Sequence, residues 1–299
     1  MNAPARADLW VPASLELGEG PRWVDGHLVF VDILSGTLLT ADGHRPGAAR
    51  TLASTAPLSL GAVAPVASSP GEWVAAVGTG IALLTEDSQL SWLGRPAAGG
   101  VPRRMNDGVC DPRGRFWATC MAWDATPGGG SVFRVDHDGT ITMVVDRLTI
   151  PNGPAFTADG STMYLADSAR GLIFRHNVDH AGQLGPAREF VRIGDGQPDG
   201  MTVDDAGCLW VAVWGAGEVR RYGPDGSLQH AVTVPAQQPT APCLGGPDGR
   251  RLFVTTAAYG LTGDRVGLSG GVFALDVETP GTPAAGFIYA QRDTSRAEP

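Results

Sequence analysis

Four oxygen-bearing side chains stand at nearly one fixed distance ahead of an aromatic residue. Glu19, Asn106 and Asp199 each lie 11 residues before a Phe or a Trp, and Asn152 lies 12 residues before a Tyr. Carboxylate and amide oxygens are the ligands that hard divalent cations such as Ca²⁺ prefer, and two carboxylates sharing a site repel unless a cation lies between them. The set therefore predicts one divalent metal ion. Because it contains no His or Cys, we expect calcium first, with zinc, manganese and iron(II) left open.

Turn formation is the alternative explanation for three of these positions. Asn106 begins Asn-Asp-Gly, Asn152 begins Asn-Gly and Asp199 begins Asp-Gly, and all three are good turn sequences. Glu19 lies in Gly-Glu-Gly-Pro, where a glutamate is not a natural turn former. The shared distance from the aromatic residue favours the ligand interpretation for the set, although each position taken singly is more often a turn.

The aromatic residues that define this distance belong to a repeat that runs along the chain. Each copy is a turn followed by a short apolar strand, and successive aromatics are 43 to 47 residues apart. Each unit also holds further short strands separated by Gly, Asp and Asn turns, and no segment has the caps and 3.6-residue period of a convincing helix. The six aromatics are Phe30, Trp73, Trp117, Tyr164, Trp210 and Phe253.

Repeats of 40 to 50 residues made of four strands are typical of propeller blades. We therefore predict an all-β fold, a six-bladed β-propeller with four-stranded blades, since a two-sheet sandwich would not explain six evenly spaced copies. Residues 1–299 are expected to form a single domain, with an ordered core from about residue 10 to residue 290 and a frayed tail over 291–299. The first strand of each blade lines the central channel, so the four polar residues would form one ring. The other two units would place Ala62 and Pro242 in that ring.

The composition indicates which binding partners and which cell compartment to expect. A formal net charge of −9 argues against a nucleic-acid surface, and the most apolar stretch, residues 51–70, is broken by prolines and serines, so we expect no membrane span. The first eight residues lack the apolar core of a secretion signal. The four cysteines have no metal-ligand spacing, which indicates free thiols. We expect a cytoplasmic protein, a monomer or a weak homo-oligomer.

Several stretches together resemble the gluconolactonase, regucalcin and senescence-marker-protein family of six-bladed propellers. The resemblance extends over about residues 16–275 and is specific in order and spacing. A late stretch, CLGGPDGRRLFVTTA at 243–257, further resembles bacterial sugar lactonases of that family. The main motifs are LGEGPRW at 17–23, RMNDGVCDPRGRFW at 104–117, PNGPAFTADG at 151–160 and PDGMTVDDAGCLWVA at 198–212.

The resemblance implies a role for individual residues. Glu19, Asn152 and Asp199 match the metal ligands of the family, and Arg104 and Asn106, with Asp107 beside them, match the residues that bind substrate or ordered water. Many sugar-lactone members carry an acid shortly after the second-motif strand. Trp123 stands at that place here, followed by Asp124. A tryptophan there would make the substrate pocket smaller and more apolar, although packing on a loop explains it equally well.

These residues imply a metal-dependent carboxylic ester hydrolase that opens a small lactone, with a sugar aldonolactone as the first expectation. The ion would polarise the carbonyl and activate a water, Asp199 would be the first candidate to accept the proton and Asp107 the second, and Arg104 would orient the lactone. Two alternatives stay open. One is hydrolysis of a non-sugar lactone or a phosphotriester at the same metal, and the other is a non-enzymatic propeller that binds calcium.

Overall fold

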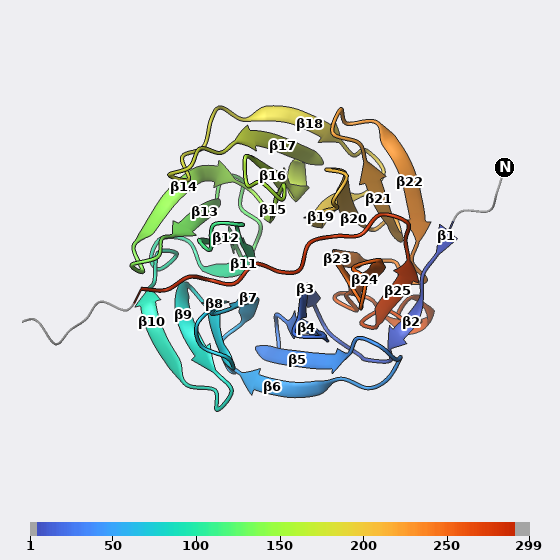
Figure 1. Ribbon diagram of the computed structural model, residues 1–299. Coiled ribbons are helices and arrows are strands. Elements are labelled where there is room, and N and C mark those ends of the chain that lie inside the picture. Colours follow the sequence, from blue (N-terminus) through green and yellow to red (C-terminus); the bar gives the residue numbers. More distant parts are fainter. Residues whose placement is uncertain (1–4, 291–299) are drawn as a thin grey trace, which may run out of the picture.

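The computed structural model describes residues 5–290, which form six β-sheets arranged around a central axis (Figure 1). The predicted six-bladed β-propeller with four-stranded blades is therefore confirmed. Residues 1–4 and 291–299, the latter being the predicted frayed tail, lie outside the described part of the chain. No helix in the described part is long and apolar enough to cross a membrane.

Each blade runs outward from a strand at the channel to a strand at the rim. The first three blades are β3 (Gly18–Val24), β4 (His27–Asp32), β5 (Thr37–Asp42) and β6 (Arg50–Ser54); β7 (Leu60–Pro65), β8 (Glu72–Val77), β9 (Gly80–Thr85) and β10 (Leu90–Gly94); and β11 (Arg103–Cys110), β12 (Phe116–Ala122), β13 (Gly130–Val135) and β14 (Ile141–Leu148).

The last three blades complete the ring, and the two ends of the chain meet in the sixth. They are β15 (Pro151–Phe156), β16 (Thr162–Asp167), β17 (Leu172–Asn177) and β18 (Arg188–Arg192); β19 (Gln197–Val203), β20 (Leu209–Trp214), β21 (Glu218–Tyr222) and β22 (Leu228–Thr233); and β23 (Pro239–Gly245), β24 (Arg251–Thr256), β25 (Val272–Asp276) and β2 (Asp8–Val11).

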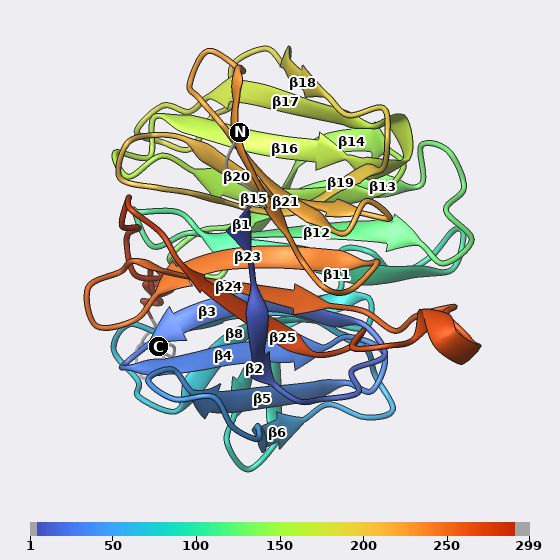
Figure 2. The same cartoon turned by 90° about the vertical axis from the view of Figure 1, so that its right-hand side faces the viewer.

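The amino-terminal strands close the ring. β2 pairs antiparallel with β25 and forms the rim of the sixth blade (Figure 2). β1 (Ala5–Arg6) pairs parallel with β22 and adds a fifth strand to the fifth blade. Because each closing pair joins segments far apart in sequence, the ring is held by backbone hydrogen bonds as well as by packing between blades.

The hydrophobic core is divided into wedges between successive blades. The predicted strand aromatics all lie in the second strand of their blades and are all buried. In the described residues, each of the six blade-to-blade contacts has its own cluster of buried apolar side chains. A blade therefore buries both faces only when its neighbours are present, which explains why the repeat must close into a ring.

A carboxy-terminal strap crosses one face of the ring. The strap, residues 277–290, passes over the channel from the sixth blade towards the rim of the second (Figure 1). Isolated bridges join Gly281 to Asp204 and Phe287 to Val66. Residues of the strap and the last residues of the inner strands line a cavity of about 290 Å³ at this end of the channel. The strap thus covers one mouth, and the other mouth holds the predicted ring of polar residues.

Candidate active site

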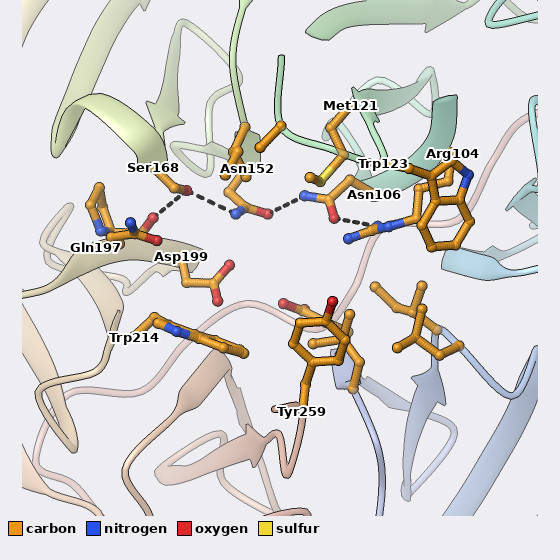
Figure 3. Close-up of a pocket in the computed structure, with 17 residues that line it drawn as sticks. Arg104, Asn106, Met121, Trp123, Asn152, Ser168, Gln197, Asp199, Trp214 and Tyr259 are labelled. Atoms are coloured by element: carbon orange, nitrogen blue, oxygen red, sulfur yellow. Dashed lines mark hydrogen bonds between the residues drawn. The ribbon is translucent and has the colours of Figure 1, made fainter. Parts of the chain in front are cut away.

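A cavity of about 280 Å³ opens at the mouth opposite the strap. Its lining includes Glu19, Asn106, Asn152 and Asp199, which come from the inner strands β3, β11, β15 and β19 of four blades (Figure 3). All four side chains are buried. The structure therefore brings the four predicted residues to one place, together with Arg104 and Trp123.

Irregular pairing at the same level of the inner strands positions these side chains. The register between the first and second strand breaks after Glu19, after Met105, after Asn152 and after Pro198. Such bulges bend a strand and change the direction of its side chains. The predicted polar residues thus lie in or beside the breaks, which lets one residue per blade face the axis.

The two blades that would place Ala62 and Pro242 in the ring show the same irregularity. The breaks enclose Gly61 and Thr240, so Ala62 lies directly beside the break of its blade and Pro242 lies two residues beyond Thr240. A Cβ at Gly61 would lie 2.7 Å from the carbonyl oxygen of Asn106, so the glycine lets the strands approach closely. The breaks enclose one residue of the inner strand in these two blades and two residues in the other four.

A chain of hydrogen bonds runs along one wall of the cavity (Figure 3). Arg104 Nη1 donates to Asn106 Oδ1 at 2.6 Å, and Asn106 Nδ2 donates to Asn152 Oδ1 at 2.7 Å. Asn152 Nδ2 donates to Ser168 Oγ at 2.9 Å, and Ser168 Oγ donates to the carbonyl oxygen of Pro198 at 2.5 Å. This wall connects the third, fourth and fifth blades and ends at the residue before Asp199.

Two aspartates hold the loops that lead into the ligand strands. Asp32 accepts hydrogen bonds from the backbone amides of Glu16 and Leu17, just before β3. Asp167 accepts from the amides of Thr149 and Ile150, just before β15. Each is the last residue of the second strand in its blade. The two blades that carry Glu19 and Asn152 therefore share one device for fixing the entry to the inner strand.

The carboxylates near the axis are poorly neutralised. Burial raises the pKa of Glu19 well above its usual range, and the negative charges of Asp199 and Asp107 raise it further. Burial and the charge of Asp107 likewise raise the pKa of Asp199. None of the ion pairs that the structure shows among residues 5–290 involves these three acids. A positive charge placed between them would remove the repulsion.

Asp107 lies apart from the cavity. Its side chain is buried and accepts hydrogen bonds from the amides of Gly108 at 2.6 Å and Gly153 at 2.9 Å, and it is not among the residues that line the mouth. Burial raises its pKa to about 6, against the opposing effect of Arg22 and the two amides. The structure thus separates Asp107 from its neighbour Asn106, which does face the cavity.

Arg104 and Trp123 form the outer part of the same wall. The Arg104 guanidinium is buried, and that burial lowers its pKa to about 10. The indole ring of Trp123 lies 5.5 Å from the Arg104 Cζ, and its side chain is 52% exposed. An exposed aromatic ring at the mouth beside a cation is placed to contact a bound molecule. Asp124 faces solvent instead, where it bonds Thr126.

Comparison with known proteins identifies the family to which this chain belongs. The sequence pattern of the family described as "SMP-30/Gluconolactonase/LRE-like region" matches residues 17–258. The chain belongs to this family. It is 35% identical to 6-deoxy-6-sulfogluconolactonase of Pseudomonas putida over 274 residues, with 89% of this chain and 92% of that protein covered. It is 33% identical to a pentonolactonase of Haloferax volcanii, with 91% and 95% covered.

A solved structure of the same family has the same fold. The calcium-binding protein regucalcin of Agrobacterium tumefaciens superposes with a TM-score of 0.87 at 28% identity, and the match covers 95% of this chain and 98% of that one. The family resemblance noted in the sequence is therefore confirmed, and the similar proteins named here include lactonases.

Sequence reasoning missed four polar or aromatic residues of this cavity. Ser168, Gln197, Trp214 and Tyr259 line it, and none carries a sequence motif that marks it. Three of them end or follow the second strand of a blade, as Trp123 does. Because neighbouring strands are antiparallel, the end of the second strand lies beside the start of the first. The residues just after each strand aromatic were therefore the signal that could have found them.

Proposed function

We propose that this protein is a metal-dependent hydrolase that opens a small lactone, with a sugar aldonolactone as substrate and calcium as the ion. One observation carries the proposal: two buried carboxylates, Glu19 and Asp199, face one cavity beside two amides, and neither forms an ion pair with a side chain among residues 5–290. The names of the similar proteins support the reaction class, since two of them are lactonases of sugar acids.

The donor set fits a hard divalent cation. Among residues 5–290 no three His, Cys, Asp or Glu side chains could hold a metal ion by themselves, so the ion would also need amide oxygens. Glu19, Asn152 and Asp199 would supply the ligands, with Asn106 Oδ1 nearby. Oxygen donors with two negative charges suit Ca²⁺ better than the nitrogen and sulfur sets of structural zinc sites.

The protein side chains divide the remaining chemistry between them. A bound divalent ion would act as a Lewis acid on the lactone carbonyl and lower the pKa of a water. Asp199 accepts the proton as the water oxygen bonds to the carbonyl carbon. The ring C–O bond then breaks, and the ring oxygen takes up the proton that Asp199 accepted, which gives the hydroxy acid and returns Asp199 to its ionised form. Arg104, held by Asn106, orients the carbonyl and supports negative charge as it develops.

Asp107 has a supporting place in this scheme. Because it lies outside the cavity, it acts on the site through its charge and through its bond to the Gly153 amide, one residue after Asn152. Asp199, which lines the cavity, is therefore the base that we favour, and a direct proton transfer to Asp107 is the second choice.

The shape of the cavity suits a flat ring with one polar edge. The hydrogen-bonding wall runs from Arg104 to Ser168, whereas Trp214 and Tyr259 lie on the other side (Figure 3). Sugar rings offer hydroxyl groups at their edges and C–H groups on their faces, and aromatic rings can cover such a face. A volume of about 280 Å³ is enough for one small lactone.

The four cysteines are free and buried, which supports our placement of the reaction in the reducing cytoplasm.

A second candidate is hydrolysis of a less polar lactone or a phosphotriester at the same site. Trp123 favours it, because its indole ring stands where many sugar lactonases carry an acid. A non-enzymatic calcium-binding role has less support, because Arg104 and two amides converge on an open cavity that a binding scaffold would not need.

Turnover of a lactone panel tests the proposal. Protein stripped with a chelator is refilled with Ca²⁺, Zn²⁺, Mn²⁺ or Fe²⁺ in turn and assayed on aldonolactones, apolar lactones and a phosphotriester. We expect ion-restored hydrolysis of aldonolactones, and Asp199→Ala should lose it. Restored activity on the other esters alone would move the substrate to the second candidate. Tight ion binding without turnover on any substrate would contradict the enzyme and favour a binding protein.

A further inference from the structure

The hydrogen-bonded wall of the cavity has a direction that its two ends determine. The Arg104 guanidinium can only donate hydrogen bonds, and the carbonyl oxygen of Pro198 can only accept them. Asn106 must therefore turn its oxygen towards Arg104 and its amide nitrogen towards Asn152. Asn106 Nδ2 also donates to the carbonyl oxygen of Pro151 at 3.1 Å, which fixes the same orientation independently.

The same reasoning continues through Asn152 to Ser168. Asn152 must present its oxygen to Asn106, which leaves its nitrogen for Ser168. Ser168 Oγ accepts that bond and must give its own proton to Pro198. Every member of the chain has one allowed orientation, and each amide oxygen keeps a second lone pair beyond the one used in the chain.

Ser168 is the member of this chain that joins two ligand-bearing blades. It follows Asp167 at the end of β16 in the fourth blade, and its hydroxyl group reaches the strand β19 of the fifth blade. Its acceptor, Pro198, directly precedes Asp199. The side chain is 3% exposed, so water does not readily replace either bond. One hydroxyl group therefore fixes the Asn152 amide and the backbone beside Asp199 at the same time.

We propose that Ser168 is a positioning residue of the metal site. Its hydroxyl group holds the Asn152 oxygen and the Asp199 strand at the spacing that a divalent ion requires. This inference rests on the proposed function, because it concerns the ligands of the same ion. Groups that orient metal ligands in this way typically change metal affinity 10- to 100-fold when they are removed.

Direct titration of the ion tests the inference without an activity assay. Ca²⁺, Mn²⁺ and Zn²⁺ are each titrated by calorimetry into chelator-stripped wild type, Ser168→Ala and Ser168→Thr, and Tm is measured for each protein. Ser161→Ala is the matched control, since Ser161 precedes the same strand β16 at its far end and is exposed. A Ser168→Cys variant is only slightly larger than the wild type and weakens both hydrogen bonds, so it serves if the alanine variant does not fold.

The expected result is ion binding that is roughly 10- to 100-fold weaker in Ser168→Ala, unchanged in Ser161→Ala, and restored to within a few fold in Ser168→Thr. A lower Tm with unchanged ion affinity would show that Ser168 serves stability alone and would overturn the inference, leaving the proposed function intact. Equal affinity in Ser168→Cys and the wild type would also overturn it. If the wild type binds none of the three ions, the proposed function fails and this inference fails with it.

Discussion

Two groups of buried carboxylates in this chain have opposite surroundings. The turn group, Asp111 and Asp204, lies where the first strand of a blade turns into the second. The channel group, Glu19, Asp107 and Asp199, lies around the central axis. Both groups are almost fully buried, so burial alone does not distinguish them.

Each carboxylate of the turn group is surrounded by donors. Asp204 accepts bonds from the amides of Ala206 and Cys208, from the indole nitrogen of Trp210 at 2.9 Å, and from Arg221 Nε at 2.7 Å. The other member repeats this pattern with two amides, an indole and an arginine. A buried charge that is paired and hydrogen-bonded in this way contributes to the fold.

The channel group receives backbone bonds, but it has no ion pair within the described part of the chain. Burial raises the pKa of all three acids, and repulsion from neighbouring acids raises the pKa of Glu19 and Asp199 further. These raised pKa values mean that the ionised group opposes folding at neutral pH. Function is a reason to retain such an arrangement, because a site that must bind a cation has to leave negative charge unpaired. Under the proposed function, the contrast between the two groups is therefore a contrast between stability and activity.

Removal of the Asp199 charge should give the largest effect. Asp199→Asn keeps the size and one oxygen but removes the proposed proton acceptor and half of the carboxylate charge of the proposed metal ligands, so we expect kcat to fall about 10³-fold. The chelator-stripped variant should unfold at a higher temperature than the stripped wild type, because the repulsion is relieved. Steady-state kinetics and calorimetric melting measure the two effects. A variant that loses activity and also melts lower would place Asp199 with the turn group.

Disruption of the turn group should do the reverse. Asp204→Ala leaves Arg221 and the Trp210 indole without their partner, so we expect the free energy of unfolding to fall by about 3–5 kcal/mol. Urea denaturation measures this loss, and turnover per folded molecule should stay at the wild-type value. Asp225→Ala is the control, since its carboxylate is exposed and bonds only its own turn. A loss of turnover in the folded fraction would break the division between the groups.

The next test is the pH dependence of the stability of the chelator-stripped protein, which should distinguish the channel group from the turn group. An acid whose pKa is raised on folding, such as Asp107 at about 6, holds a proton in the folded state that the unfolded chain has already released. Stability therefore falls as pH rises from about 4 to above 6, by an amount on the order of 3 kcal/mol for this residue. Thermal melts from pH 4 to 8 measure it. Addition of the divalent ion should reverse the trend, and a flat profile in the stripped protein would contradict the repulsion.

The sequence predicted much of this arrangement because the strand aromatics and the polar residues recur at nearly regular intervals. The aromatic spacing located all six second strands, and the polar residues at a shared distance from those aromatics meet in the cavity. The sequence could not predict that Asn106 faces the cavity while Asp107 faces away, because a bulge decides which of two adjacent residues points inward. The contacts of Ser168 were equally hidden, since they depend on the spacing between two blades.

The smallest expected effect concerns the arginines that accompany the two groups. Arg221 of the turn group pairs with a carboxylate, whereas Arg104 of the channel bonds an amide and lies beside Trp123. Trp123→Glu would give Arg104 a nearby acid at the mouth and replace an apolar surface with a hydroxyl-binding one. We expect the ratio of kcat/KM for an aldonolactone to that for an apolar lactone to rise roughly 10-fold. Trp123→Phe should leave the ratio near the wild-type value, because the aromatic face remains. If the ratio stays unchanged in the glutamate variant, Trp123 packs on its loop without contacting substrate, and Arg104 alone defines the polar end of the cavity.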